Sequence, residues 1–364
     1  MKKMFNCHES VLVELIHDTA WYRMVKDMNH IRIPGSNPIK LSGHIKDQPD
    51  NEWEILDRDG VNIHENEGYV KEALANPDKR LTHPCDVFFD DDPSVPAGVQ
   101  DKFGTLVLTS ASMSPKYLTR QWPKRITAGQ NCSWKTILEK FHNEKTPTSN
   151  AIVIIDRYLF AYNSETRTDY KNGIRNVFGI LNELLPASFS GEFQVLIVFD
   201  DTAISRGASI ELITKGLQKI KKQLRRDYVP TIELLTVNRD IDIQAFSETH
   251  DRKIISNYYM ISCDHGFSAV SPTEGHEDDI DYIGESKGVW SQTIRYEGIY
   301  AGIDGEVEDL DYSSLPIRTS DYSLSFLRKY LDNLKGGRKG YSYICNGNAN
   351  VPITDFRNRL ITNE

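Results

Sequence analysis

The clearest hydrophobic pattern of the chain lies between residues 151 and 237, where three largely apolar runs alternate with two amphipathic segments. The runs are 151–155, 193–199 and 231–237, and an aspartate follows each of the first two. Apolar runs of this length are typical of strands buried on both faces of a sheet, and the segments between them are long enough to form helices. The pattern predicts a mostly parallel sheet with helices on both faces.

Both intervening segments have helical periodicity. In the first, apolar residues recur from Ile174 to Leu185, and Pro186 ends the helix. In the second, at about 100° per residue, an apolar stripe faces a basic stripe. The two stripes are Ile213, Leu217, Ile220 and Leu224, against Lys215, Lys219, Lys222 and Arg226. The basic stripe is either a solvated outer helix face or a surface that docks an acidic polymer, a lipid surface or a protein partner.

The rest of the chain divides around a polar, proline-containing stretch at residues 144–150. Residues 1–145 are predicted to form a smaller α+β domain of unknown role. Residues 150–345 form the domain that contains the alternating pattern, and apolar residues at helical spacing predict a further helix over 324–334. Residues 346–364 are predicted to be a C-terminal tail.

Polar residues gather where the predicted strands end. Asp156 and Arg157 follow the first strand, Asp200 and Asp201 end the second, and Asn238 follows the third. Sites in open α/β sheets lie at the carboxyl ends of strands, so we expect these side chains to line one site.

The segment His250-Asp251-Arg252-Lys253-Ile254-Ile255-Ser256-Asn257-Tyr258 comes next, and its β-branched and aromatic residues, continuing to Ile261, predict a strand. Side chains two apart on a strand face the same way, which places His250 and Arg252 on one side. An imidazole can transfer a proton or attack phosphorus, and a guanidinium can donate two hydrogen bonds to phosphate oxygens. The pair predicts an anion site; the alternative is that His250 is a hydrogen-bonded edge group without chemistry.

These residues resemble the phospholipase D superfamily, whose members carry HxKxxxxD on a strand after a strand-helix-strand-helix-strand order. Here the motif reads His250-x-Arg252-xxxx-Asn257. With Gly266-Phe267 after it, the segment looks like the divergent branch that includes the C-terminal domain of MIT-domain proteins and related bacterial proteins. The resemblance covers about residues 150 to 330. It implies a phospholipase D-like sheet flanked by helices, preceded by the smaller α+β domain.

The resemblance also implies residue roles. His250 would be the nucleophile, Arg252 would replace the phosphate-binding lysine, and Asn257 would occupy the carboxylate position. Asparagine carries no charge to orient the histidine. Arginine replaces the compact ammonium group of lysine with a planar guanidinium. The segment 264–268 lacks the glycine, small residue and asparagine that usually follow. The expected ligand-binding residues are Asp156, Arg157, Asp200, Asn238, Ser268, Lys215, Lys219, Lys222 and Arg226.

Three functions are compatible with these observations. The first is a degenerate phospholipase D-like module that recognises a phosphorylated ligand or an acidic partner. The second is a metal-independent phosphodiesterase or nuclease using His250, which would act as a homodimer because superfamily catalysis uses two motifs and this chain has one. The third is a non-catalytic scaffold whose contacts are made by residues 1–145. Similar bacterial proteins accompany genome-defence or mobile-element systems, so the resemblance implies antiviral defence as a setting.

Composition narrows these choices. A net charge of −9 argues against broad adhesion to DNA or anionic lipid, and five scattered cysteines without CxxC pairing support neither a disulfide framework nor a zinc site. The sequence contains no P-loop, GxGxxG or HExxH motif, so we expect no cofactor and no metal. Without a long apolar run or a signal peptide, it predicts a soluble cytoplasmic protein. The acidic stretch 274–281 is predicted to be a solvent-facing loop.

Overall fold

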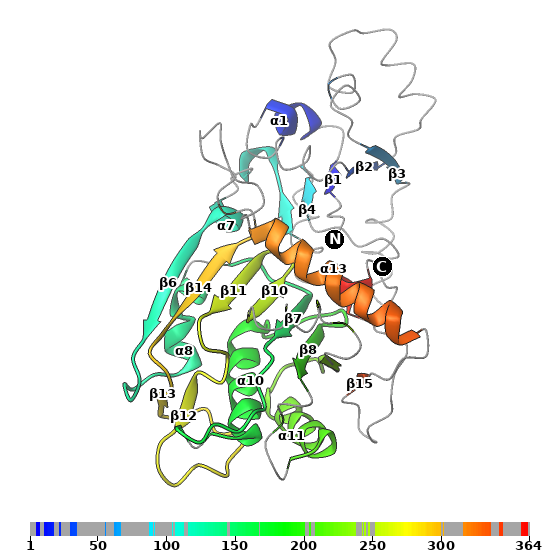
Figure 1. The fold of residues 1–364 in the computed structure, drawn as a ribbon. Helices are drawn as coiled ribbons and strands as arrows, with labels where there is room; N and C mark the ends of the chain where they lie inside the picture. Colours follow the sequence, from blue (N-terminus) through cyan, green and yellow to red (C-terminus); the bar gives the residue numbers. More distant parts are fainter. Residues whose placement is uncertain are drawn as a thin grey trace, which may run out of the picture.

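The structure is a computed structural model, and Figure 1 shows its arrangement of helices and strands. The residues that it describes are 5–7, 11–17, 22, 30–34, 55, 62–66, 87–89, 91, 104, 106–112, 116–143, 146–166, 168–200, 204, 208–237, 242, 244, 247, 252–299, 301, 316–335, 342–344 and 358–362. No helix in these ranges combines the length and the apolarity that crossing a membrane requires.

The centre of the fold is a mixed sheet that has eight strands within the described ranges. Its order is β15 (Ser342–Ile344), β9 (Thr231–Val237), β8 (Gln194–Asp200), β7 (Ala151–Ile155), β10 (Lys253–Ser256), β11 (Tyr259–Cys263), β14 (Gln292–Gly298) and β6 (Gln121–Ile126). Strands β7, β8 and β9 are parallel. Each further strand pairs antiparallel with its neighbour, from β10 to β6 on one side and at β15 on the other.

Two sequence expectations about this sheet are corrected. The expected mostly parallel arrangement holds only for β7 to β9, and the single strand expected over 253–261 is the hairpin of β10 and β11. Ser256 Oγ accepts hydrogen bonds from the backbone N–H groups of Tyr258 and Tyr259 at 3.0 and 3.1 Å, which closes the turn. A hairpin and one long strand share the same β-branched and aromatic composition, so composition alone did not distinguish them.

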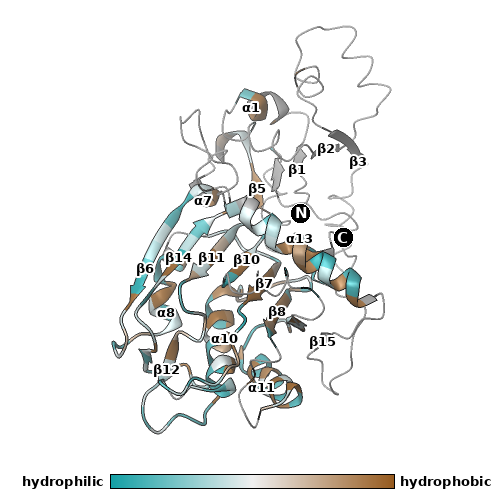
Figure 2. Ribbon diagram, in the orientation of Figure 1, coloured by the Kyte–Doolittle hydropathy of each residue, from teal (hydrophilic) through white to brown (hydrophobic). Residues whose placement is uncertain are grey.

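Helices cover both faces of the sheet, as the alternating pattern predicted. On one face lie α10 (Tyr170–Leu184) and α11 (Ile210–Gln223); on the other lie α13 (Pro316–Lys335) and α14 (Arg359–Thr362). Neighbouring residues of β7 belong to different cores: Ile154 packs in the α10 core and Ile155 in the α13 core. Such alternation requires apolar residues at every position of the strand. Figure 2 shows this as hydrophobic colouring in the central strands.

The apolar stripe predicted for residues 213–224 is confirmed. Ile213, Leu217 and Ile220 are 0% exposed and Leu224, the C-cap of α11, is 1% exposed. Each buried side chain of this size contributes roughly 1.5–3 kcal/mol relative to exposure, so the stripe anchors α11 on the sheet and sets which side faces outward.

A second sheet lies in the first part of the chain, with five parallel strands among the described residues. Its order is β3 (Asn62–Asn66), β2 (His30–Pro34), β1 (Phe5–Cys7), β4 (Val87–Phe89) and β5 (Leu106–Leu108). The turn between β10 and β11 is tied to this region. The Tyr258 hydroxyl accepts from the Leu106 N–H and donates to the Gly104 carbonyl oxygen, both at 2.7 Å.

The large sheet extends across the boundary predicted at residue 145. Strand β6 pairs with β14, and the short helices that follow β6 pack beside the α10 face. The remaining short elements are α1 (Leu12–His17), a 3-10 helix (Ser110–Ser112), α7 (Lys116–Thr119), α8 (Trp134–Ile137), α9 (Glu139–Asn143), β12 (Val270–Pro272) and β13 (Ser286–Gly288).

Candidate functional site at the strand edge

The carboxyl ends of β7 and β8 meet the beginning of β10 at one edge of the large sheet. Antiparallel pairing of Ile155 with Lys253 brings Asp156 near Arg252, and parallel pairing of β7 with β8 brings Asp200 to the same edge. We call Asp156, Arg157, Tyr158, Asp200 and Arg252 the strand-edge site. Four of these five residues were predicted from the sequence to share a site.

Asp156 is a buried carboxylate that joins two segments. Its side chain accepts hydrogen bonds from the Phe267 N–H at 2.7 Å and from the Tyr158 N–H at 3.0 Å, and the residue is 1% exposed. Gly266 adopts a φ of 123°, and a Cβ there would lie 3.0 Å from an Asp156 oxygen. A residue without a side chain therefore lets the 266–267 backbone approach the carboxylate.

Burial raises the pKa of Asp156 above its ordinary value of 3.8; the hydrogen bonds from Phe267 and Tyr158 and the charge of Arg252 act in the opposite direction. A raised folded-state pKa gives a contribution to stability that is full below the ordinary pKa and is lost as pH rises through the folded-state pKa. We expect the unfolding free energy of the wild type, relative to Asp156→Asn, to fall as pH rises from about 4. Urea denaturation of both proteins across pH measures this; a difference that grows with pH contradicts it.

Arg157 and Asp200 form an ion pair at the same edge. Arg157 Nε lies 2.9 Å from Asp200 Oδ2, and the side chains are 16% and 0% exposed. The Asp200 N–H also donates to the Arg157 carbonyl oxygen at 3.2 Å. The pair thus ties the loop after β7 to the end of β8.

Arg252 lies beside this pair. Its Nη1 donates to the Asp264 carbonyl oxygen at 2.8 Å, while its Nε is buried and has no hydrogen-bond partner among the described residues. The Tyr158 ring, 39% exposed, has Arg252 Cζ 6.0 Å and Arg157 Cζ 5.0 Å from its centroid. Two guanidinium groups therefore flank one accessible aromatic ring.

The described acids around Arg252 are each engaged by other donors. Asp156 accepts from two backbone N–H groups, and Asp200 pairs with Arg157. The Asp264 carboxylate pairs with Arg295 at 2.7 Å and accepts from the Thr293 N–H, and the bond from Arg295 is the main cause that lowers its pKa. Among the described residues, Arg252 therefore has no carboxylate as an ion-pair partner.

The structure does not bring every predicted residue to this edge. Asn257 lies at the other end of β10, where its Oδ1 accepts from the Asn150 N–H at 3.3 Å. The four residues of β10 therefore separate Asn257 from Arg252. The expected role of Asn257 in the carboxylate position of the motif, toward His250, stays a prediction, because His250 lies outside the described residues. Ser268 Oγ accepts from Asn172 Nδ2 at 3.0 Å and so faces α10. His250, Asn238 and Asp201 lie outside the described residues.

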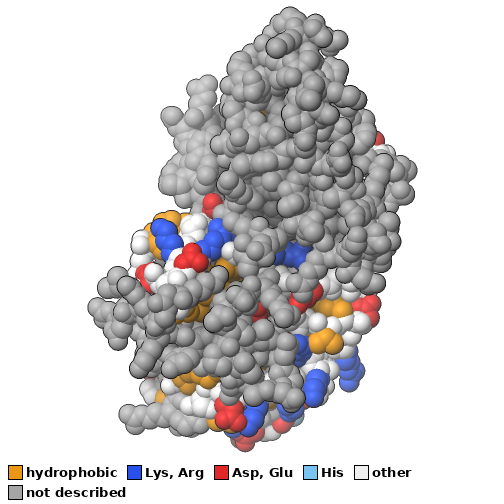
Figure 3. Space-filling model, turned by 90° about the vertical axis from the view of Figure 1, so that its right-hand side faces the viewer, with side chains coloured by type: hydrophobic (Ala, Val, Ile, Leu, Met, Phe, Trp, Pro, Cys, Tyr) orange, Lys and Arg blue, Asp and Glu red, His pale blue; other side chains and the backbone are white. Residues whose placement is uncertain are grey.

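The predicted basic stripe of α11 is largely engaged within the protein. Lys215 pairs with Glu211 at 2.6 Å, and Lys219 pairs with Asp281 at 2.9 Å. Arg226 donates to the carbonyl oxygens of residues 224 and 182. Lys222 is exposed and has no partner in the described ranges. Figure 3 shows Lys and Arg side chains next to acidic ones at the bottom of the view.

The sequence analysis did not identify Tyr158, a residue of the site, or Asp264, which contacts Arg252. Tyr158 stands in an Asp-Arg-Tyr segment directly after a buried strand, and that position was the available signal. Asp264 contributes its backbone carbonyl, which no side-chain pattern reveals.

No protein-family model matches the chain, and no curated protein matches it either. Within the described ranges, no group of three His, Cys, Asp or Glu residues is placed to hold a metal ion. The described residues of the strand-edge site offer two guanidinium groups and an exposed aromatic ring.

Proposed function

We propose that this chain is a phospholipase D-like recognition module whose strand-edge site binds the phosphate group of a phosphorylated ligand. Arg252 is the main ligand-binding residue, and the exposed Tyr158 ring lies beside the bound group. The order of strands and helices from β7 to β10 and the position of Arg252 at the start of β10 support this proposal.

One observation carries the proposal: Arg252 keeps donor capacity while the surrounding acids are engaged elsewhere. A guanidinium offers five N–H donors, and this one uses Nη1 in a bond to a neutral carbonyl oxygen. Its Nε is buried without a described acceptor. A phosphate can supply the negative charge that no described residue supplies to Arg252 as an ion pair, in the two-pronged geometry that arginine favours.

Recognition fits the site better than catalysis. A histidine nucleophile requires a group that orients it and stabilises its charge. Asn257 carries no charge and lies at the far end of β10. Asp156 and Asp200 are committed to the Phe267 N–H and to Arg157, where they hold the loops of the site together.

Inorganic phosphate tests the proposal. We expect Arg252→Gln to weaken phosphate binding about tenfold or more, because it removes a charge-assisted pair of hydrogen bonds. Calorimetry and the chemical shift of the Arg252 Nε–H measure it. Arg125→Gln is the matched control, since Arg125 is exposed on β6, away from the site, and has no described partner. Equal affinities of the Arg252→Gln variant and the wild type would refute the proposal.

A separate assay distinguishes recognition from catalysis. The proposal predicts that purified protein leaves nucleic acid and simple phosphodiesters intact under metal-free conditions. Cleavage that disappears in His250→Ala would replace it with the homodimeric phosphodiesterase that the motif resemblance also allows.

A further inference from the structure

A cavity of about 240 Å³ lies on the α10 face and shares no lining residue with the strand-edge site. Its walls come from the short helix α8, from α10, and from the segment that joins β12 to β13. Trp134 forms one apolar wall; its Nε1–H donates to Asn176 Oδ1 at 2.9 Å, which fixes the indole. A Cβ at Gly179 would lie 2.5 Å from the Trp134 ring, so the missing side chain leaves space for it.

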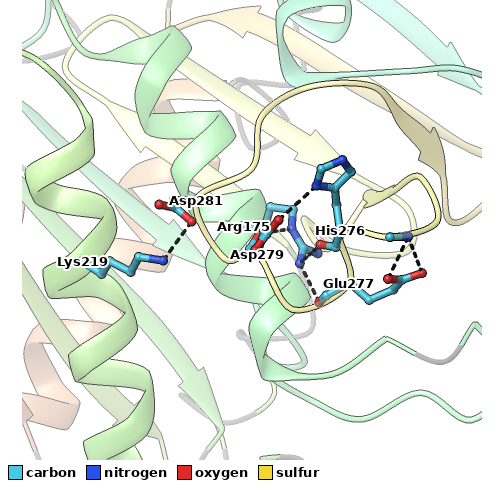
Figure 4. A network of polar contacts seen from close by, with 7 residues as sticks. Arg175, Lys219, His276, Glu277, Asp279 and Asp281 are labelled. Carbon is cyan, nitrogen blue, oxygen red and sulfur yellow. Dashed lines mark hydrogen bonds and ion pairs between the residues drawn. The ribbon is translucent and has the colours of Figure 1, made fainter.

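Arg175 holds another part of the cavity wall in place. We call residues 273–285 the acidic strap. Arg175, itself 4% exposed, donates to the strap carbonyl oxygens of His276 at 3.2 Å, Glu277 at 2.9 Å and Asp279 at 2.9 Å, as Figure 4 shows. Its Nη1 donates to Asn172 Oδ1 at 3.0 Å. The arginine therefore fastens the backbone of the strap to α10.

Ion pairs and a ring contact add to this attachment. Lys171 pairs with Asp278, and Lys219 pairs with Asp281 at 2.9 Å. Within the strap, the His276 ring stacks on Tyr282 at 4.1 Å between centroids. Tyr282 and Ile283 then line the cavity. A wall held in this way is formed before a ligand arrives, which reduces the entropy that binding would cost.

Two cations and one acid contribute charge to the cavity walls. Lys135 is exposed and makes no hydrogen bond or ion pair with a described residue. Arg175 bonds to carbonyl and amide oxygens, which carry no net charge. Burial lowers the pKa of its guanidinium; the nearby carboxylates that act in the opposite direction, on Asp169 and in the strap, do not line the cavity. Glu183 is engaged by His142 at 2.8 Å and by Asn182 at 3.1 Å. Lys135 and Arg175 outnumber Glu183 among the lining side chains, so the formal charge of the lining is positive.

We propose that this cavity is a second binding site, which takes a small organic anion that carries a planar apolar group. The anionic group pairs with Lys135 at the rim. The planar group packs against the apolar lining residues Trp134, Val270 and Ile283. This assignment does not depend on phosphate binding at the strand edge.

Cinnamate and its neutral amide, cinnamamide, test the assignment. Both are planar and almost equally large; they differ in charge and in the N–H donors that the amide carries. We expect cinnamate to bind in the millimolar range or better and to shift the indole N–H signal of Trp134, with cinnamamide about fivefold weaker or more. Lys135→Glu reverses the rim charge and is expected to weaken cinnamate binding by a similar factor. Lys140→Glu is the matched control, because Lys140 is also exposed and does not line the cavity.

Several results would overturn the assignment. These are equal affinity for cinnamate and cinnamamide, wild-type affinity of Lys135→Glu, and no cinnamate binding at millimolar concentration. Loss of cinnamate binding in Arg252→Gln would place the anion at the strand edge instead. Conversely, we expect Lys135→Glu to leave phosphate binding unchanged, so each of the two proposed binding sites can be refuted without the other.

Discussion

Asp156→Ala is expected to lower the free energy of unfolding by about 3 kcal/mol, because it leaves two backbone N–H groups without an acceptor. One is the N–H of Phe267, which is fully buried, and the other is that of Tyr158. Gly266 brings the 266–267 backbone against the carboxylate so closely that water has little room to replace it. Urea denaturation followed by circular dichroism measures the change.

Two further variants make this result specific. Asp156→Asn keeps one oxygen acceptor and is expected to lose less stability than Asp156→Ala. Asp264→Ala removes a carboxylate of the same sheet edge whose side chain is 42% exposed, and is expected to cost under about 1 kcal/mol. If Asp156→Ala and Asp264→Ala were equally stable, Asp156 would not have the structural role assigned to it.

Arg175→Met is expected to destabilise the protein by about 2–3 kcal/mol, since a buried guanidinium supplies four hydrogen bonds and methionine supplies none. The loss should be concentrated in the acidic strap, residues 273–285, because three of the four acceptors belong to it. Denaturation gives the total change. Hydrogen exchange of the strap amides gives its location, and we expect faster exchange there than in β7 and β8.

Lys219→Met is the comparison for this second variant. It removes the pair with Asp281, whose members are 51% and 26% exposed, and is expected to cost under about 1 kcal/mol. Unchanged exchange of the strap in Arg175→Met would show that side-chain ion pairs, and not the arginine, hold the strap.

For the strand-edge site, the sequence predicted which residues lie together but not which contacts they make. Asp156, Arg157 and Asp200 were expected together because each stands at the end of a buried strand, and the structure brings them together. Their roles could not be predicted in the same way. Asp156 bonds to a backbone N–H 111 residues away, and such a partner depends on how the chain returns to the sheet.

Asn257 shows the opposite case. The resemblance put it in the carboxylate position of the motif that also contains Arg252. The segment turns back after Ser256, so the four residues of β10 carry Asn257 to the other edge of the sheet, beside Asn150. A linear spacing states how many residues separate two side chains, and only the strand direction states how far apart they lie.

The sequence correctly predicted that the basic stripe lies on one face of α11. Two of its residues, however, bind partners in distant segments of the chain. Lys219 pairs with Asp281 of the acidic strap, 62 residues away, and Arg226 donates to the carbonyl oxygen of Asn182 on α10. The acidic stretch 274–281 is largely solvent-exposed, as predicted, and Arg175 and two lysines also attach it to α10 and α11.

The sequence by itself determined that β7, β8 and β9 are strands buried on both faces, because each is a largely apolar run. It also determined the helices α10 and α11 and the buried stripe of α11, because these depend on a periodicity of 3.6 residues within short segments. Tertiary structure alone decided the antiparallel half of the sheet, the partners of Asp156 and Arg252, and the cavity behind Trp134. These features depend on which distant segments pack together, and long-range packing leaves no periodic trace in the local sequence.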